Sequence, residues 1–155
     1  MTNAVSGVYD KLQESGGFAL FGRTGFSTYA HTDSRMYSYL PADLDRLKRT
    51  QMLRAAPIFM IRTKELYDRV LRWWVYCAMD PDCISPKNSS KLCPKTVNDW
   101  FNHQPPCHRQ DQSALNILLA NMYNHKIDNY SVRVYQGYIQ ILEEYGNELG
   151  FPKSC

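Results

Sequence analysis

Five polar residues stand directly before a largely apolar segment in the second half of the chain, His108-Arg109-Gln110-Asp111-Gln112. They supply an imidazole, a guanidinium, two amides and a carboxylate, groups that can bind hydroxyls or support proton transfer. The following residues, Ser113 to Tyr123, predict a buried helix, and Pro105 and Pro106 keep that helix from starting earlier. A helix N-terminus favours a negative group, so Asp111 is the candidate catalytic carboxylate.

The same cluster has a purely structural interpretation. Asp111 would then cap the helix, with His108 and Arg109 satisfying its carboxylate. In the functional interpretation, Asp111 lies at the edge of a cleft, where it accepts a sugar hydroxyl or supports charge separation, and His108, Arg109 and Gln112 orient it or contact the sugar. A buried helix holds its first turn rigidly, as a site requires. The residues alone leave both interpretations open.

A second helix is predicted over Lys64 to Met79, with Thr63 as its N-cap and the strand candidate Pro57 to Ile61 before it. Its expected inner side carries Leu66, Val70, Trp73, Trp74 and Cys77. Trp73 and Trp74 are candidates for stacking against a sugar ring. At helical spacing beside Leu and Val, however, tryptophans are more often part of the core, and we favour that interpretation.

The remaining elements are shorter. We expect strands or extended pieces at Phe18–Phe21, Phe26–His31 and Ser131–Tyr135, helices at Leu44–Arg49 (capped by Asp43) and Tyr138–Leu149, and a long loop from Asp80 to Gln104. Strands that alternate with helices indicate an α/β or α+β layer architecture. Residues 1–15 are expected to form a poorly ordered N-terminal segment, residues 16–150 the folded domain, and residues 151–155 a tail.

Five cysteines, Cys77, Cys83, Cys93, Cys107 and Cys155, suggest an oxidising compartment. Disulfides are favoured over a zinc site made by Cys83, Cys93, Cys107 and His108, since no Cys-x-x-Cys pair is present. Four cysteines allow three connectivities and the fifth stays unassigned; one plausible pairing is Cys83–Cys93 with Cys77–Cys107. The cysteines indicate a lumenal or secreted domain, whereas no signal peptide or membrane-spanning run is recognisable, so we expect the targeting segment to lie outside this sequence.

Other kinds of chemistry find little support. The Asp80-Pro81-Asp82 pattern could bind a divalent cation, but after a helix it is more typical of a solvated turn. No nucleophile elbow, phosphate-binding loop or dinucleotide-binding glycine pattern is present. The net charge of +3 on 155 residues is mild and the basic residues are scattered, so nucleic acid is not an expected partner.

Four strings of residues carry a resemblance to a known family: Arg35–Pro41 (RMYSYLP), Trp73–Ala78 (WWVYCA), Cys83–Pro86 (CISP) and Cys107–Asn121 (CHRQDQSALNILLAN). Together they resemble little-characterised animal glycosyltransferase-like proteins of the secretory pathway, over residues 16–135. The last string is the most specific. The resemblance implies a nucleotide-diphospho-sugar transferase-like fold, of which this chain would be the C-terminal, acceptor-side half.

The resemblance also implies an activity, the transfer of a sugar from a nucleotide-sugar donor to a glycan or protein acceptor in the Golgi or a related lumen. Pro57 to Trp74 and Asp111-Gln112 are similar to elements that line the acceptor side of such a cleft. The donor half would bind Mn²⁺ through an Asp-x-Asp at a strand end, and this chain has no equivalent, so no metal or cofactor is expected here. The alternative is a non-catalytic, disulfide-stapled secreted interaction domain.

Overall fold

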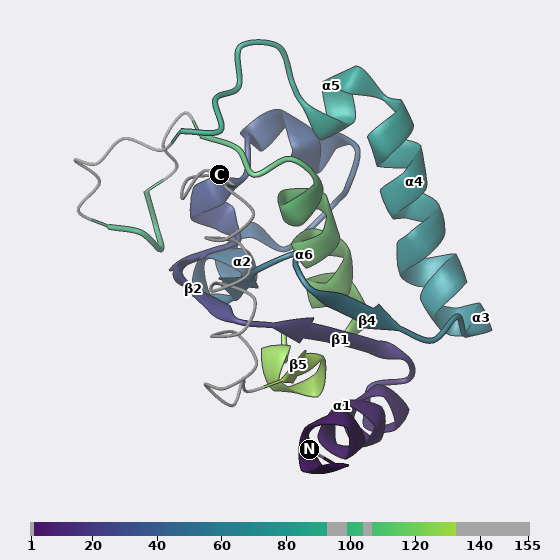
Figure 1. The fold of residues 1–155 in the computed structure, drawn as a ribbon. Helices are drawn as coiled ribbons and strands as arrows, with labels where there is room; N and C mark the ends of the chain where they lie inside the picture. Colours follow the sequence, from purple (N-terminus) through teal and green to yellow (C-terminus); the bar gives the residue numbers. More distant parts are fainter. Residues whose placement is uncertain (1, 93–98, 104–106, 133–155) are drawn as a thin grey trace, which may run out of the picture.

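A computed structural model describes residues 2–92, 99–103 and 107–132 (Figure 1). The first half contains α1 (Thr2–Glu14), β1 (Phe18–Phe21), β2 (Arg23–Ser27), the 3₁₀ turns η1 (Tyr29–His31) and η2 (Ser34–Ser38), α2 (Leu44–Arg49), β3 (Gln51–Leu53) and β4 (Ile58–Met60). The second half contains α3 (Lys64–Leu66), the π-helical segment η3 (Tyr67–Leu71), α4 (Arg72–Met79), α5 (Pro81–Ile84), α6 (Asp111–Met122), η4 (Ile127–Asn129) and β5 (Ser131–Val132). The predicted mixture of strands and helices is confirmed at this level.

A three-stranded sheet in the order β4-β1-β5 forms the centre. β1 pairs antiparallel with β4 and parallel with β5, and all four of its residues are buried. Its side chains alternate between two clusters: Phe18 and Leu20 belong to the main core with α6, and Ala19 and Phe21 pack with α1 through Leu12. Helices therefore cover both faces of the sheet, which explains why this strand reads as an unbroken apolar run.

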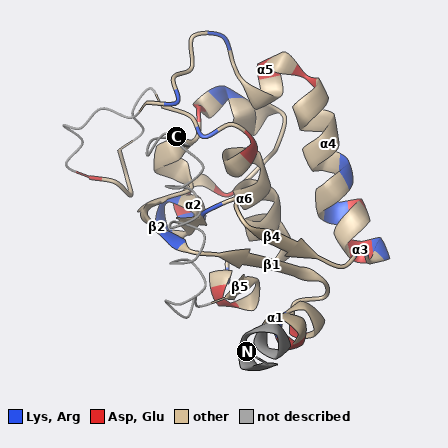
Figure 2. Ribbon diagram, in the orientation of Figure 1, with Lys and Arg blue, Asp and Glu red and all other residues tan. Residues whose placement is uncertain are grey.

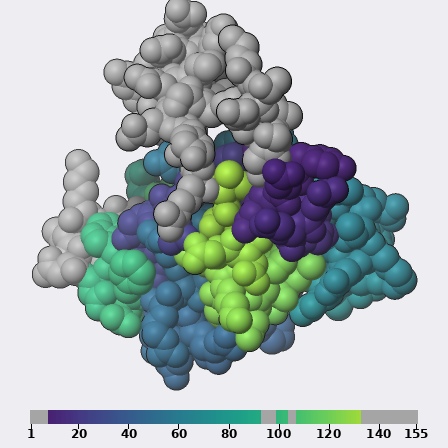
Figure 3. All heavy atoms as spheres, turned by 90° about the horizontal axis from the view of Figure 1, so that it is seen from below, coloured from purple at the N-terminus to yellow at the C-terminus, as the bar shows by residue number. Residues whose placement is uncertain are grey.

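The N-terminal helix lies against the last described residues of the chain, as the view from below shows (Figure 3, purple beside yellow-green). The Tyr123 hydroxyl donates to the Ser15 carbonyl oxygen at 2.5 Å, and the Lys11 ammonium donates to the carbonyl oxygen of Asp128. Residues 2–14, which lie in the segment predicted to be poorly ordered, form the helix α1.

The predicted helix over Lys64 to Met79 is continuous, and the side chain of Thr63 accepts from the Leu66 amide as expected of its N-cap. Its middle, η3, is a π-helical turn, and such turns are often found near functional sites. Ion pairs Lys64–Asp68 and Arg69–Glu65 occupy the outer side of its first half. Figure 2 shows that these charges end where α4 begins, and the outer surface of α4 is largely uncharged.

Several boundaries differ from the sequence-based predictions. The extended piece expected at Phe26–His31 is the end of β2 followed by η1. The long loop after Asp80 contains α5, since the Asp80 carboxylate accepts from the amides of Asp82 and Cys83 and Pro81 occupies the first helical position. The last predicted strand is described only as β5, and the last predicted helix, Tyr138–Leu149, falls outside the described residues. Within the described ranges, no helix is long and apolar enough to cross a membrane.

Candidate functional site

The helix that follows the polar cluster, α6, is enclosed by the rest of the domain. Its residues Ser113 to Ala120 are all buried. It begins after Gln110, whose backbone has φ 45° and ψ −116°, a conformation that costs a residue with a Cβ roughly 1–3 kcal/mol. The Gln110 side-chain amide donates to the Ser85 hydroxyl at 3.0 Å. A strained turn fixed at its tip thus directs the chain into α6, and strain of this kind is concentrated at functional sites.

Asp111 is the first residue of α6, and it is exposed. The predicted cap role is wrong, because Gln110 occupies the N-cap position and no side-chain cap hydrogen bond is made there. No ion pair joins Asp111 to His108, Arg109 or any other described residue. The carboxylate is therefore available to a ligand, at the positive end of a helix that cannot shift without disrupting the core.

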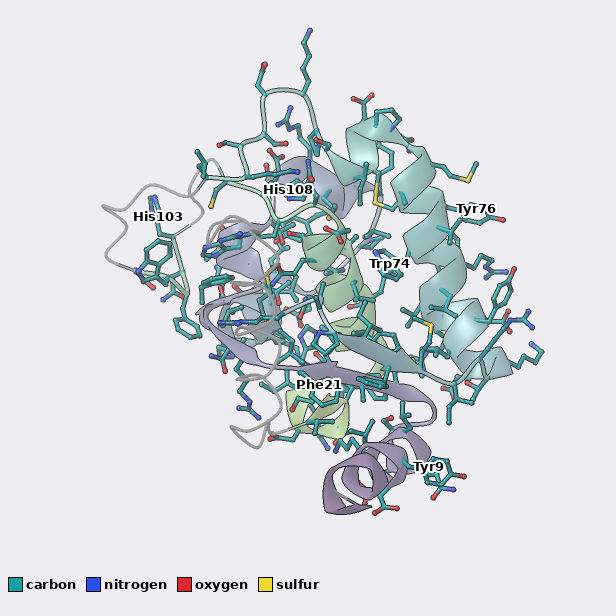
Figure 4. All side chains as sticks on the ribbon, in the orientation of Figure 1. Tyr9, Phe21, Trp74, Tyr76, His103 and His108 are labelled. Atoms are coloured by element: carbon teal, nitrogen blue, oxygen red, sulfur yellow. A yellow bond between two sulfur atoms is a disulfide. The ribbon has the colours of Figure 1, made fainter. Side chains whose placement is uncertain are left out.

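Trp74 reaches this turn from the neighbouring helix. Its indole N–H donates to the Asp111 carbonyl oxygen at 3.2 Å, and Figure 4 shows the side chain directed from α4 toward α6. The ring is partly buried against the core. The indole of Trp74 thus contacts the backbone of the residue that carries the exposed carboxylate.

Trp73 has a different environment. The prediction that it lies on the inner side of the helix is wrong, because 44% of its surface is exposed. Its ring packs edge-on against Tyr76, with centroids 6.0 Å apart, and the Arg72 guanidinium lies 5.1 Å from its centroid. The π-helical turn changes the spacing of side chains around the helix, which rotates Trp73 away from the direction that a regular helix predicts.

His108 is buried, with both ring nitrogens engaged by the backbone. Nδ1 accepts from the Asp33 amide at 3.1 Å, which makes Nε2 the protonated nitrogen, 3.0 Å from the Ile84 carbonyl oxygen. Burial lowers the pKa of His108 below its ordinary value. The ring therefore joins the start of η2 to the end of α5, and neither nitrogen is free to contact a sugar.

Gln112 and Asn116 attach α6 to β3. The Gln112 amide donates to the Leu53 carbonyl oxygen at 3.0 Å, and the Asn116 amide donates to the same oxygen at 2.9 Å. The Leu53 backbone N–H in turn donates to Asn116 Oδ1 at 2.8 Å. The Asn116 side chain thus makes the two backbone hydrogen bonds, to the N–H and the C=O of Leu53, that a neighbouring strand would otherwise make. Sequence reasoning missed this residue, although an Asn inside an apolar helix is a signal for a buried partner.

Arg109 is held by the backbone at the same turn. Its amide donates to the His31 carbonyl oxygen at 3.1 Å, an oxygen that also accepts from the Ser113 hydroxyl at 2.8 Å. Its guanidinium carbon lies 5.8 Å from the ring centroid of Phe26. The side chain therefore extends toward β2 and η1, and not toward the Asp111 carboxylate.

A disulfide joins α4 to α5, the helix that lies next to the turn before α6. Cys77 at the end of α4 is bonded to Cys83 in α5, so the expected pairs Cys83–Cys93 and Cys77–Cys107 are wrong. The two cysteines are six positions apart, and the chain between them reverses direction, which brings them closer than their spacing suggests. Cys107 is disulfide-bonded as well. The zinc alternative loses two of its thiolates, Cys83 and Cys107, to these bonds.

Two other places were candidates for a site: the Asp80-Pro81-Asp82 pattern and a surface depression beside α5. Asp80 uses its carboxylate to cap α5, and the described residues contain no group of three or more His, Cys, Asp or Glu that could hold a metal ion. A surface depression of about 320 Å³ lies beside α5, and of the candidate residues only Asp82, from the Asp80-Pro81-Asp82 pattern, lines it. Its lining residues are Arg35, Ser38, Tyr39, Asp82, Pro86 and Lys87.

Comparison with known proteins does not assign the chain to a family. No family model, no curated protein and no solved structure matches it.

Proposed function

We propose that this chain carries the acceptor side of a sugar-transfer site, with Asp111 as the carboxylate that binds, and in the reaction deprotonates, an acceptor hydroxyl. The observation that carries the proposal is the exposed Asp111 carboxylate, which forms no ion pair with a described residue, on a buried helix whose first residue bonds through its backbone carbonyl oxygen to the Trp74 indole. Carboxylates accept hydrogen bonds from sugar hydroxyls, and an indole ring offers the apolar face of a sugar a surface to pack against.

The strained backbone at Gln110 supports the same conclusion. The Gln110 side chain is hydrogen-bonded to Ser85, and the His108 ring to the backbone of Asp33 and Ile84. The Gln112 side chain is hydrogen-bonded to the Leu53 backbone. These residues therefore position Asp111 without contacting the sugar themselves. Of the two roles expected of His108 and Gln112, this assigns them the orienting one, and it leaves Asp111, Trp74 and Arg109 as the groups that meet the acceptor.

In the full reaction, a nucleotide-sugar donor would lie opposite this surface, in the fold expected of nucleotide-diphospho-sugar transferases. The Mn²⁺ that such donors require would be held by the donor half, since the described residues offer no cluster of ligands for it. The buried disulfide between Cys77 and Cys83 is compatible with a secretory-pathway lumen or a secreted protein.

A transfer assay of this chain together with the donor half, supplied with UDP-sugars, Mn²⁺ and a panel of glycan acceptors, tests the proposal. We expect transfer to fall by about 100-fold or more in Asp111→Asn, the loss typical of a general base. Asp82→Asn is the matched control, because Asp82 is exposed on α5 and makes no ion pair with a described residue. Transfer at the wild-type rate in Asp111→Asn would contradict the assigned role, and so would the absence of any acceptor binding by the wild-type chain.

A second candidate function, a non-catalytic interaction domain, rests on the outer face of α4. Trp73, Val75, Tyr76 and Met79 are 44–77% exposed there, and Figure 4 shows Tyr76 directed away from the core. Contiguous exposed apolar side chains often mark an interaction surface. In that case Asp111→Ala would change stability by less than about 1 kcal/mol, the size of a helix-dipole contribution, and no sugar ligand would be affected.

A further inference from the structure

Three aromatic rings are stacked next to the proposed acceptor site. The imidazole of His31 lies between the Phe26 ring, at a centroid distance of 3.4 Å, and the Trp100 ring, at 5.4 Å, with interplanar angles of 20° and 23°. The segment that carries Trp100 is fixed to β2, since the carbonyl oxygens of Trp100 and Phe101 accept from the Ser27 amide and hydroxyl. The stack is therefore a fixed part of the fold.

Two polar atoms are buried in this region without a partner. His31 is 1% exposed, and its Nδ1 makes no hydrogen bond with any described group. Thr28 is fully buried, its hydroxyl also lacks a partner, and it does not cap η1. The two residues are three positions apart in a 3₁₀ turn, where side chains at that spacing lie one above the other. An unpartnered buried polar atom is costly, and a bound ion is one explanation for such an atom in a native structure.

Arg109 adds an unpaired positive charge to the same region. Its backbone N–H bonds to the His31 carbonyl oxygen, its guanidinium lies against Phe26, and its charge contributes to the lowered pKa of His31. Nε is buried without a partner, and no described carboxylate forms an ion pair with this side chain. Guanidinium groups in such positions are suited to binding an oxyanion.

We propose that Arg109, with the Thr28 hydroxyl and the His31 ring beside it, binds an oxyanion carried by the acceptor, so that the acceptor is an acidic sugar bearing a sulfate ester or a carboxylate. This inference rests on the proposed function. The Cα atoms of Arg109 and Asp111 lie at most about 7 Å apart. Because the Arg109 side chain extends toward Phe26 and away from Asp111, the oxyanion would belong to the saccharide unit next to the one that Asp111 binds. The anion would neutralise the unpaired guanidinium and supply partners for the buried polar atoms.

Calorimetric titration of the full chain with three disaccharides tests the inference: one sulfated, one with an unsulfated uronic acid, and one neutral. We expect at least one acidic disaccharide to bind about tenfold or more tightly than the neutral one, and Arg109→Gln to remove that preference. Comparison of the sulfated and uronic ligands identifies which oxyanion is recognised. Arg49→Gln, which changes an exposed arginine at the end of α2, is the matched control and should bind as the wild type does.

Thr28→Val separates a ligand-binding role from a structural one. Because the hydroxyl has no partner in the unliganded chain, its replacement by a methyl group of similar size should leave the thermal midpoint unchanged or raised. Binding of the acidic disaccharide should still weaken severalfold. Equal binding of the acidic and neutral ligands, or equal binding by Arg109→Gln and Arg49→Gln, would overturn the inference.

The two proposals fail separately. Arg109-dependent binding of an acidic disaccharide without any sugar transfer would support the oxyanion site and contradict the transferase function. Asp111-dependent transfer to neutral acceptors, with no loss in Arg109→Gln, would leave the function standing and overturn the oxyanion site alone.

Discussion

The attachment of α6 to β3 through Asn116 makes a quantitative prediction. In Asn116→Ala, the Leu53 backbone N–H loses its acceptor in a fully buried position, and the Leu53 carbonyl oxygen loses one of its two donors. An orphaned buried donor costs about 1–3 kcal/mol, and the lost side-chain packing adds to it, so we expect the free energy of unfolding to fall by about 3 kcal/mol. For a chain of this length the thermal midpoint should drop by about 6–12 °C.

Urea unfolding followed by tryptophan fluorescence measures this change. Gln112→Ala should cost only about 1 kcal/mol, since Asn116 still donates to the Leu53 carbonyl oxygen. The double variant should lose more than the sum of the two, because that oxygen then has neither donor. Asn121→Ala, which removes an exposed amide contact to the Pro41 carbonyl oxygen, is the control and should change stability by less than about 0.5 kcal/mol. A loss in Asn116→Ala no larger than in Asn121→Ala would refute this reasoning.

Three further predictions concern the surroundings of the site. Burial, aided by the Arg109 charge, lowers the pKa of His31 from 6.5 to about 4. Between these two pH values the unfolded chain binds a proton at His31 and the folded chain does not, so the free energy of unfolding should fall by about 2 kcal/mol from pH 7.5 to pH 5. This part of the loss should be absent in His31→Gln. Removal of the disulfide by Cys77→Ala with Cys83→Ala should lower the free energy of unfolding by about 2 kcal/mol through the entropy of the short loop, and a stability unchanged by reduction of the wild-type protein would count against the bond. Gln110→Gly should be more stable than Gln110→Ala by about 1 kcal/mol, as measured in urea, because only glycine adopts the backbone at this turn without strain; the reverse order would show that the turn is not strained.

Local sequence signals predicted the elements that a single segment determines. Asp43 and Thr63 cap the helices that follow them, and the apolar runs at Phe18–Phe21 and after Asp111 form β1 and α6. In each case a cap or an apolar pattern specifies the structure without help from distant parts of the chain.

The predictions from the sequence were wrong where the position of a residue depends on an irregular helix or on contacts with distant parts of the chain. Trp73 was predicted on the inner side of a regular helix, and the π-helical turn before it rotates it outward. The cysteine pairing depends on the reversal at α5, which the prolines and the Asp80 cap create within a segment read as a loop. The roles of His108 and Gln112 depend on backbone groups far away in sequence, at Asp33 and Leu53, and spacing alone cannot indicate these.

For the candidate site, the sequence suggested Asp111 and a buried helix after it. The structure adds that the Asp111 side chain is exposed at the first residue of α6, directly after the strained backbone of Gln110. Arg109 contacts His31 and Phe26, which lie 78 and 83 positions earlier, and no pattern in the sequence connects them. The aromatic stack and its unpartnered polar atoms could likewise not be predicted, since the stack joins His31 to Trp100, which lies far away in the sequence.

The most direct test of the central claim is an NMR titration that follows the indole N–H signal of Trp74 as glycan acceptors are added. This N–H is bonded to the Asp111 carbonyl oxygen, so it reports on a ligand at the Asp111 carboxylate. The proposed function predicts a saturable shift of the Trp74 signal that is lost in Asp111→Asn and kept in Asp82→Asn. A signal that no glycan moves, or a shift that is the same in Asp111→Asn, would contradict the claim that Asp111 forms the acceptor side of a sugar-transfer site.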